Sequence, residues 1–223
     1  MIPLRDENPT RRFAVVTATL IVANIAVFLY ELSLPGTRAL EAFFSDFALI
    51  PANISNTASP AVYRTVLTSM FLHGDWLHLL GNMLYLWIFG NNVEDSMGRI
   101  RFVLFYLLCG AGAAASQILV EPHSQLPMVG ASGAISGVLG AYLLLFPRTR
   151  VLVLLPIWIF IRFVYVPAWL MLLFWFALQL VSGAVNMGRM HEGGIAFWAH
   201  SGGFLAGLIL IPFFKRRSVR LLQ

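Results

Sequence analysis

Long uncharged apolar runs constrain this chain more than any other feature of its sequence. The segments from Phe13 to Tyr30 and from Phe102 to Val120 contain no charged residue. A helix that crosses a bilayer needs about 20 mainly apolar residues, so each run is long enough to span. The whole chain is 59% hydrophobic and 11% charged, whereas soluble domains are nearer half apolar and a quarter charged. We therefore expect an all-α polytopic membrane protein.

Six segments are expected to be membrane helices. They are Phe13–Tyr30, Trp76–Val93, Phe102–Val120, Ser132–Phe146, Tyr165–Val185 and Ile195–Phe214. The fourth is short, because its residues extend only about 22 Å against a hydrocarbon core of about 30 Å. Residues Val151–Ile161 are also apolar, but Pro156 divides them, and we expect a membrane-associated loop there. The segment from Leu34 to about Asp75 is too polar to span and is expected to lie at the membrane interface.

Basic residues gather on one side of this predicted topology. They occupy the first 12 residues, the turn after the second helix, the loop after the fourth helix and the tail, and only Arg38, Arg64 and Arg189 fall on the other side. The positive-inside rule then places both termini in the cytoplasm. It also explains the net charge of +5 better than nucleic-acid binding does. We expect a cytoplasmic segment at 1–12, a membrane domain at 13–214 and a basic cytoplasmic tail at 215–223.

A GASG motif at residues 130–133 opens the short fourth helix. Small residues let helix backbones approach closely, which accounts for Gly133, Gly137 and Gly140 without any chemistry. Because the helix is short, Ser132 is expected below the outer membrane surface, beside the unpaired N–H groups of a helix N-terminus. Such a position stabilises an oxyanion, so Ser132 is a candidate nucleophile.

His200 is the one ionisable residue of the predicted sixth helix, and Gly203 and Gly207 share its face. Close packing of the glycine faces of the fourth and sixth helices would bring His200 near Ser132. A serine needs a base to become a nucleophile, and histidine is the usual one. The alternative is a histidine that only hydrogen-bonds to a neighbouring helix.

His78 and Asn82 lie on one face of the second helix, because they are four residues apart. Their donors are candidates for an oxyanion hole, with interhelical hydrogen bonding as the alternative. No carboxylate is expected in mid-span, which disfavours an aspartyl protease, and no H-E-x-x-H motif is present, which disfavours a zinc protease. His73 and His78 have no third metal ligand at a convincing spacing. Cys109 is expected to be a buried packing residue.

Together these motifs resemble the rhomboid intramembrane serine proteases in their six-helix bacterial form. The resemblance covers about Tyr63 to Leu208. Its motifs are the GASG sequence at 130–133, Ala199-His200 with following glycines, His78-x-x-x-Asn82, Tyr63-Arg64 and Glu94-x-x-x-Gly98-x-x-x-Phe102. It implies a six-helix rhomboid-like bundle in which a short fourth helix is central.

The resemblance also implies roles for individual residues. Ser132 would be the nucleophile and His200 its general base. Asn82, His78 and the backbone N–H of Ser132 would form the oxyanion hole. Supporting roles would fall to His73, Gly130, Gly133, Arg64 and Glu94, with Arg64 anchoring the long loop and Glu94 ordering a helix junction. The family implies no metal, nucleotide or other cofactor.

One position departs from the pattern. Ser136 stands where some rhomboids carry a tyrosine that stacks on the catalytic histidine, so another residue must orient His200. Phe174, Trp175 and Phe176 are candidates for a substrate gate.

The function implied is cleavage of transmembrane protein substrates near the outer face of a lipid bilayer, in a bacterial inner membrane and without nucleic acid. The alternatives are a catalytically silent rhomboid-like protein that binds membrane clients, and a small transporter with an anion site at the fourth helix.

Overall fold

Long apolar helices dominate the computed structural model, which describes residues 1–57, 59–158, 160–186 and 196–223. Four described helices are long and apolar enough to cross a membrane: α1 (Val15–Ser33), α8 (Arg99–Val120), α10 (Ala168–Asn186) and α11 (Phe197–Phe214). A further helical segment runs without a break through α6 (Trp76–Tyr85), the π-helical turn η2 (Leu86–Gly90) and α7 (Asn91–Met97). The shorter apolar helix α9 (Ser132–Leu145) completes the bundle.

The six predicted segments are therefore helical, with shifted ends. The first helix continues past Tyr30 to Ser33, which brings the buried carboxylate of Glu31 into it. The predicted start of the sixth helix, Ile195, lies outside the described residues, as does Arg189.

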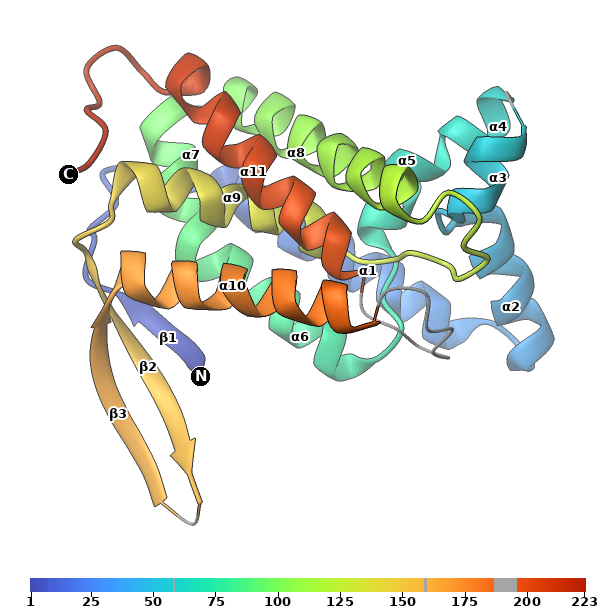
Figure 1. Cartoon of the computed structure of the whole chain (residues 1–223), viewed down its shortest axis with the longest axis horizontal. Helices are drawn as coiled ribbons and strands as arrows, with labels where there is room; N and C mark the ends of the chain where they lie inside the picture. Colours follow the sequence, from blue (N-terminus) through green and yellow to red (C-terminus); the bar gives the residue numbers. More distant parts are fainter. Residues whose placement is uncertain (58, 159, 187–195) are drawn as a thin grey trace.

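The segment predicted as an interfacial loop is built from short helices. They are α2 (Gly36–Phe47), α3 (Pro51–Asn56), α4 (Pro60–Tyr63), α5 (Thr65–Thr68) and the 3₁₀ turn η1 (Ser69–Phe71). Proline at the first position starts α3 and α4, where its missing N–H costs no helical hydrogen bond. These helices gather at one end of the bundle (Figure 1).

The membrane-associated loop predicted at Val151–Ile161 is wrong. Strands β2 (Arg150–Ile157) and β3 (Phe160–Pro167) form an antiparallel hairpin instead. The same hairpin moves the start of the fifth helix from the predicted Tyr165 to Ala168. An N-terminal strand, β1 (Ile2–Asp6), pairs antiparallel with β2 and gives a three-stranded sheet in the order β1-β2-β3. Val/Ile-rich runs favour strands over short helices, which explains the hairpin.

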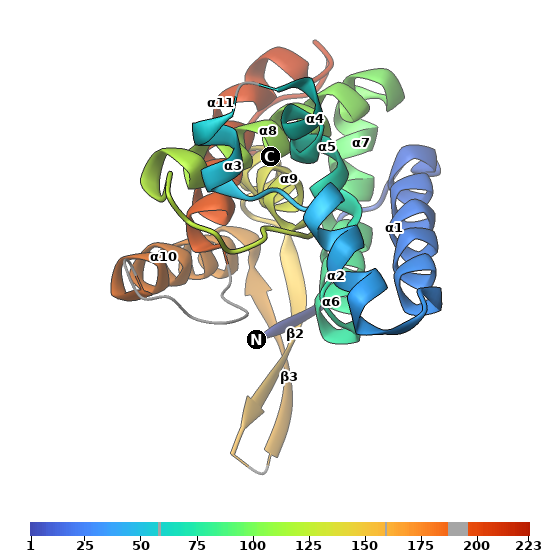
Figure 2. The ribbon, with the colours of Figure 1, turned by 90° about the vertical axis from the view of Figure 1, so that its right-hand side faces the viewer.

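Helix α9 lies in the middle of the bundle and is seen nearly end-on in Figure 2. Nearly all of its residues are buried. Glycines of α11 lie against its backbone: a Cβ built on Gly207 would lie 1.9 Å from the Gly137 carbonyl oxygen, and one on Gly203 would lie 2.0 Å from the Gly133 oxygen. The predicted packing of the two glycine faces is thereby confirmed.

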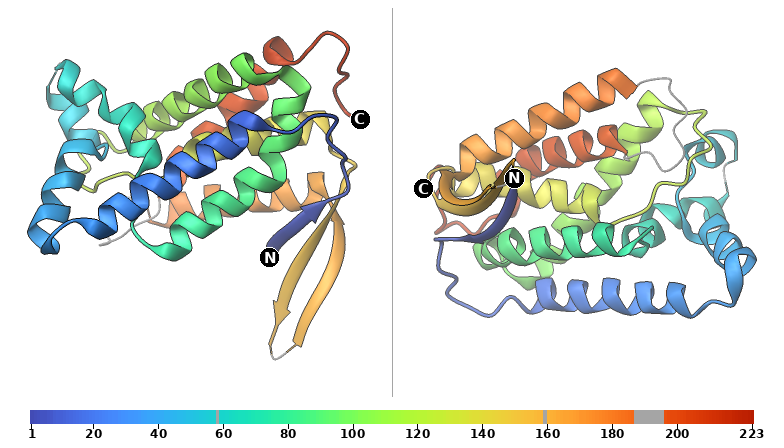
Figure 3. Two further views of the ribbon diagram at one scale, coloured as in Figure 1. Left: turned by 180° about the vertical axis from the view of Figure 1, so that it is seen from behind. Right: turned by 90° about the horizontal axis from the view of Figure 1, so that it is seen from below.

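Both termini lie toward the end of the bundle opposite the short helices (Figure 3). The carboxylate of Asp6 in β1 accepts hydrogen bonds from the Tyr142 hydroxyl of α9 and from Asn92 Nδ2 of α7. In the tail, the N–H groups of Leu222 and Gln223 donate to carbonyls at the last turn of α9. The C-terminal end of α9 is thus held by both chain ends, and its N-terminal end begins at Ser132.

Candidate active site

Ser132 and His200 lie side by side where α9 and α11 begin. Ser132 Oγ is 2.8 Å from His200 Nε2, a hydrogen-bonding distance. The glycine contacts between α9 and α11 set this distance, because any larger side chain on those faces would separate the two backbones. The structure therefore brings together the serine and the histidine that the sequence predicts as nucleophile and base.

A residue that the sequence analysis missed orients His200. Gln179 of α10 places its Oε1 at 2.8 Å from His200 Nδ1. An amide oxygen can only accept a hydrogen bond, so Nδ1 carries the proton and Nε2 presents its lone pair to Ser132. This is the tautomer that a general base requires. One signal was readable: Gln179 is a lone amide within an apolar membrane helix.

One of the aromatic residues before Gln179 lies beside the same histidine. Trp175 lies one turn earlier on α10, and its ring centroid is 6.0 Å from that of His200. Phe176 stacks on Phe204 of α11 at 4.6 Å. Of the three aromatics predicted as a gate, Trp175 contacts the site, Phe176 packs between helices, and Phe174 is exposed.

Extended chain leads into the N-terminus of α9. The segment is held by backbone pairing of Met128 with Leu49 and by the Gly130 N–H, which donates to the Ser69 carbonyl at 2.9 Å. Gly130 has φ of +114°, a backbone conformation that side chains other than glycine rarely adopt. The first N–H groups of α9 consequently point out of the helix without intrahelical partners, next to Ser132.

His78 and Asn82 face this same turn from α6. A Cβ built on Gly130 would lie 2.7 Å from His78 Nε2 and 3.5 Å from Asn82 Nδ2. Asn82 is 7% exposed, and its Nδ2 has no hydrogen-bond partner among the described residues. A buried amide donor without an acceptor is costly in a folded protein and calls for an explanation. A cavity of about 940 Å³ lined by Ser132, His200 and both of these side chains offers one.

His73 lies behind His78 rather than in contact with Ser132. Its ring centroid is 5.1 Å from that of His78, and its backbone N–H donates to the buried Glu31 carboxylate at 3.3 Å. Burial, with the neighbouring His78, lowers the pKa of His73 from 6.5 to about 4. His73 is therefore a neutral packing partner for His78 at ordinary pH.

Two further predicted residues lie away from the cavity. Glu94 accepts hydrogen bonds from the N–H groups of Val16 and Thr17 and from the Thr17 hydroxyl, so it caps the first turn of α1 from α7. The Arg64 guanidinium stands over the Phe47 ring at 5.3 Å and links the junction of α4 and α5 to α2. Both contacts join helices together.

The second serine of α9 is occupied within its own helix. Ser136 is buried, and its hydroxyl donates to the Ser132 carbonyl at 2.7 Å. Gly133 packs against α8, where a Cβ on the glycine would meet the Ala113 methyl at 2.6 Å. Among the described residues, no group of three His, Cys, Asp or Glu side chains is placed to hold a metal ion.

Comparison with known proteins gives a consistent result. A Rhomboid domain model matches residues 60–217. Rhomboid protease AarA of Providencia stuartii is 30% identical over 138 residues, which cover 56% of this chain and 48% of that protein. Rhomboid protease GluP of Bacillus subtilis is 42% identical over 78 residues, covering 35% of this chain and 15% of that protein. Rhomboid-like protein 11, chloroplastic, of Arabidopsis thaliana is 44% identical over 78 residues, covering 35% and 27%.

The chain thus matches about half or less of the length of each of these relatives. The family model, in contrast, covers well over half of the chain. With its apolar helices and the match over residues 60–217, this integral membrane protein belongs to the rhomboid family.

Proposed function

We propose that this protein is an intramembrane serine endopeptidase that cleaves transmembrane segments of membrane proteins near the outer membrane face. Ser132 is the nucleophile and His200 the general base. The observation that carries the proposal is the hydrogen-bonded series from Ser132 Oγ through the His200 ring to Gln179, at the buried start of a helix. Two relatives that carry the name rhomboid protease support it.

The reaction follows from these positions. Ser132 Oγ attacks the scissile carbonyl carbon while His200 Nε2 takes the hydroxyl proton. The resulting oxyanion accepts hydrogen bonds from the Ser132 N–H, Asn82 Nδ2 and His78. His200 then gives its proton to the leaving amine, and water hydrolyses the acyl-enzyme through the same base. The unpartnered Asn82 donor gains its acceptor only when the oxyanion forms, which favours the transition state over the ground state.

A neutral orienting residue distinguishes this site from a Ser-His-Asp triad. Gln179 fixes the histidine tautomer, as the aspartate of a triad does, but it brings no charge to offset the imidazolium. In an apolar membrane interior this avoids a buried carboxylate, which is expensive there. We expect a slower enzyme than a soluble triad protease.

The proposed setting is a bacterial inner membrane with both termini in the cytoplasm. The termini lie toward the same end of the bundle as the sheet, and α9, whose first residue is Ser132, begins toward the other end (Figure 1). With the basic end inside, substrates reach Ser132 from the outer half of the bilayer. A substrate helix must unwind there, because helical backbone in lipid keeps its hydrogen bonds and is inaccessible.

The decisive experiment is labelling of the purified protein with a fluorophosphonate, which phosphonylates an activated serine. Wild type should label, and Ser132→Ala and His200→Ala should not. Ser136→Ala is the matched control, since it removes a buried hydroxyl from the same helix and should keep labelling. Equal labelling of wild type and Ser132→Ala would exclude the protease mechanism.

Labelling alone does not show peptide cleavage. Reconstituted protein should therefore also be incubated with a membrane protein whose transmembrane segment contains helix-breaking residues. We expect cleavage near the outer end of that segment, lost in Ser132→Ala. Binding of the substrate without cleavage by the wild type would instead favour the client-binding alternative.

A further inference from the structure

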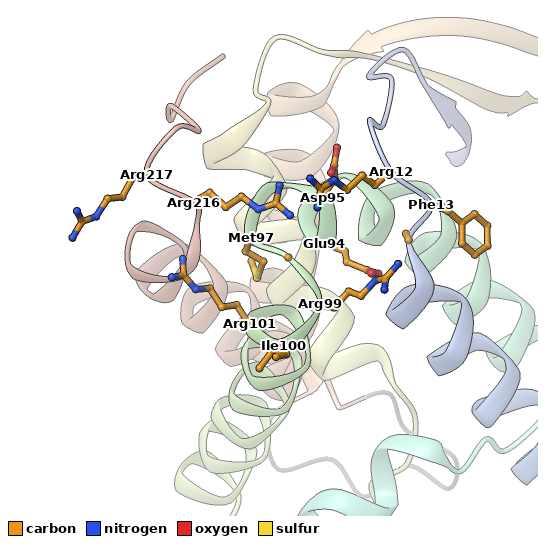
Figure 4. A pocket seen from close by; sticks show the side chains of 12 residues that line it. Arg12, Phe13, Glu94, Asp95, Met97, Arg99, Ile100, Arg101, Arg216 and Arg217 are labelled. Carbon is orange, nitrogen blue, oxygen red and sulfur yellow. The ribbon is translucent and has the colours of Figure 1, made fainter.

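A second cavity lies at the opposite end of the bundle from Ser132. It has a volume of about 740 Å³ and is lined by five arginines: Arg12, Arg99, Arg101, Arg216 and Arg217. Figure 4 shows Arg12, Arg99 and Arg216 turned toward the cavity and Arg217 pointing away from the bundle. Such a concentration of guanidinium groups favours a ligand with negatively charged oxygens.

Fixed contacts hold two of these arginines in place. The Arg216 N–H donates to the Ser96 carbonyl at 2.9 Å. Its guanidinium lies over Gly98, where a Cβ would come within 3.2 Å of Arg216 Nη2. Arg101 Nη1 lies 3.4 Å from the carbonyl oxygens of Phe214 and Lys215. These contacts tie the C-terminal tail to the α7–α8 junction, so the cavity is a built feature of the fold.

The carboxylates in the lining are already hydrogen-bonded to backbone. Glu94 caps α1 through both of its oxygens, and Asp95 Oδ2 accepts the Arg11 N–H at 2.8 Å. Within the described part of the chain, Arg12, Arg99 and Arg216 make no side-chain hydrogen bond or ion pair. Five cations against two carboxylates leave the cavity positively charged.

The cavity also marks a membrane boundary. The apolar helices α1 and α8 begin beside it and α11 ends beside it. Two apolar side chains, Phe13 and Ile100, belong to its lining and are 70% and 79% exposed. A cationic cavity with apolar side chains at the level where hydrocarbon begins matches a lipid, whose headgroup is charged and whose chains are apolar.

We propose that this cavity binds the phosphate headgroup of an anionic phospholipid of the adjacent leaflet. Arg99 and Arg216 contact the phosphate oxygens, and Phe13 and Ile100 lie along the acyl chains. The bound lipid bridges the start of α8 and the end of α11. Because the arginines repel one another when the site is empty, occupancy stabilises the folded bundle.

Native mass spectrometry of the detergent-solubilised full chain tests this proposal. The protein is titrated with phosphatidylglycerol and with phosphatidylcholine of identical acyl chains. We expect wild type to bind phosphatidylglycerol more tightly. Each arginine near an anionic lipid contributes about 1 kcal/mol of binding free energy. Arg99→Gln/Arg216→Gln should therefore weaken the binding of phosphatidylglycerol about 30-fold. The phosphatidylcholine affinity should stay unchanged.

Matched variants separate a site from diffuse charge. Arg162→Gln/Arg220→Gln removes two exposed arginines from the same end of the protein but outside the cavity, and it should bind phosphatidylglycerol like wild type. Arg99→Lys/Arg216→Lys keeps the charge and should retain most of the binding. The unchanged phosphatidylcholine affinity of Arg99→Gln/Arg216→Gln shows that the glutamine pair folds.

Three results would overturn the proposal. One is an equal loss of phosphatidylglycerol binding in Arg99→Gln/Arg216→Gln and in Arg162→Gln/Arg220→Gln, which would indicate attraction by overall charge. Another is no preference of wild type for phosphatidylglycerol. The third is displacement of bound phosphatidylglycerol by inorganic phosphate at a similar concentration, which would assign the cavity to a free anion. None of these measurements depends on protease activity.

Discussion

Replacing Gln179 with methionine removes the acceptor of His200 Nδ1–H while keeping the length and volume of the side chain. A buried donor without an acceptor costs about 1–3 kcal/mol. His200 can escape this cost by moving its proton to Nε2, but that tautomer cannot accept the proton of Ser132. In either case the reactive arrangement is depleted about 5- to 150-fold. Losing the correct tautomer in a Ser-His-Asp triad costs about 10⁴-fold, and the loss should be smaller here because Gln179 is neutral.

The assay is the rate of fluorophosphonate labelling measured over a range of reagent concentrations. Gln179→Met should lower the maximal labelling rate and leave the half-saturating concentration unchanged, because the reagent does not contact Gln179. Gln179→Glu keeps an acceptor oxygen at the same position and should recover most of the rate. Leu178→Met changes an exposed residue of the same helix and serves as the control.

If Gln179→Met were labelled at the wild-type rate, the orienting role of Gln179 would be refuted. So would a stable Gln179→Glu variant that labels as slowly as Gln179→Met, since its acceptor is retained. A loss of thermal stability that accounts for the slower labelling in both variants would mean that Gln179 only joins α10 to α11.

Four further outcomes follow from the described contacts. Asn82→Ala should lower the maximal labelling rate about 10²- to 10³-fold through loss of an oxyanion donor, and an unchanged rate would contradict that role. Gly207→Ala should lower the Tm sharply because its Cβ would meet α9 backbone, whereas Gly81→Ala, with nothing within 4 Å, should not. Glu94→Ala should destabilise the fold by about 1–3 kcal/mol, since the first turn of α1 loses its acceptor, and denaturant unfolding measures this. Because burial lowers the pKa of His73 to about 4, the unfolded chain takes up a proton between pH 6.5 and 4 that the folded protein does not, so stability falls as the pH drops through this window. His73→Gln should flatten that part of the Tm profile, and an unchanged slope would show that other groups cause it.

The helical bundle was predictable because its physical cause is local. A run of apolar residues long enough to span hydrocarbon must satisfy its own backbone, and a helix does so within one segment. The approach of Ser132 to His200 was predictable for a related reason. The glycines at 133, 137, 203 and 207 form two complementary faces, and such faces pack in only a few ways.

The sheet and Gln179 were not predictable from the same rules. The run from Arg150 to Ile157 is apolar, and one of its two strand partners, β1, lies about 150 residues earlier in the sequence. No local pattern reveals a partner so distant. The orienting role of Gln179 depends on the rotation of α10 about its own axis, which packing against α11 decides. Glu31 was placed outside the first helix because the apolar run stops at Tyr30, although the helix continues one turn further.

The pairing of β1 with β2 has a consequence for how the protein is made. Strand β1 leaves the ribosome before β2, its partner, which follows only about 150 residues later, after α9 has been synthesised. At translation rates of about 5–20 residues per second, β1 waits roughly 8–30 s with its hydrogen-bonding edge open. During that time Asp6 also lacks Tyr142, its partner on α9. Sheet closure therefore comes late in biogenesis, and the N-terminal strand locks the central helix only after most of the bundle has been inserted.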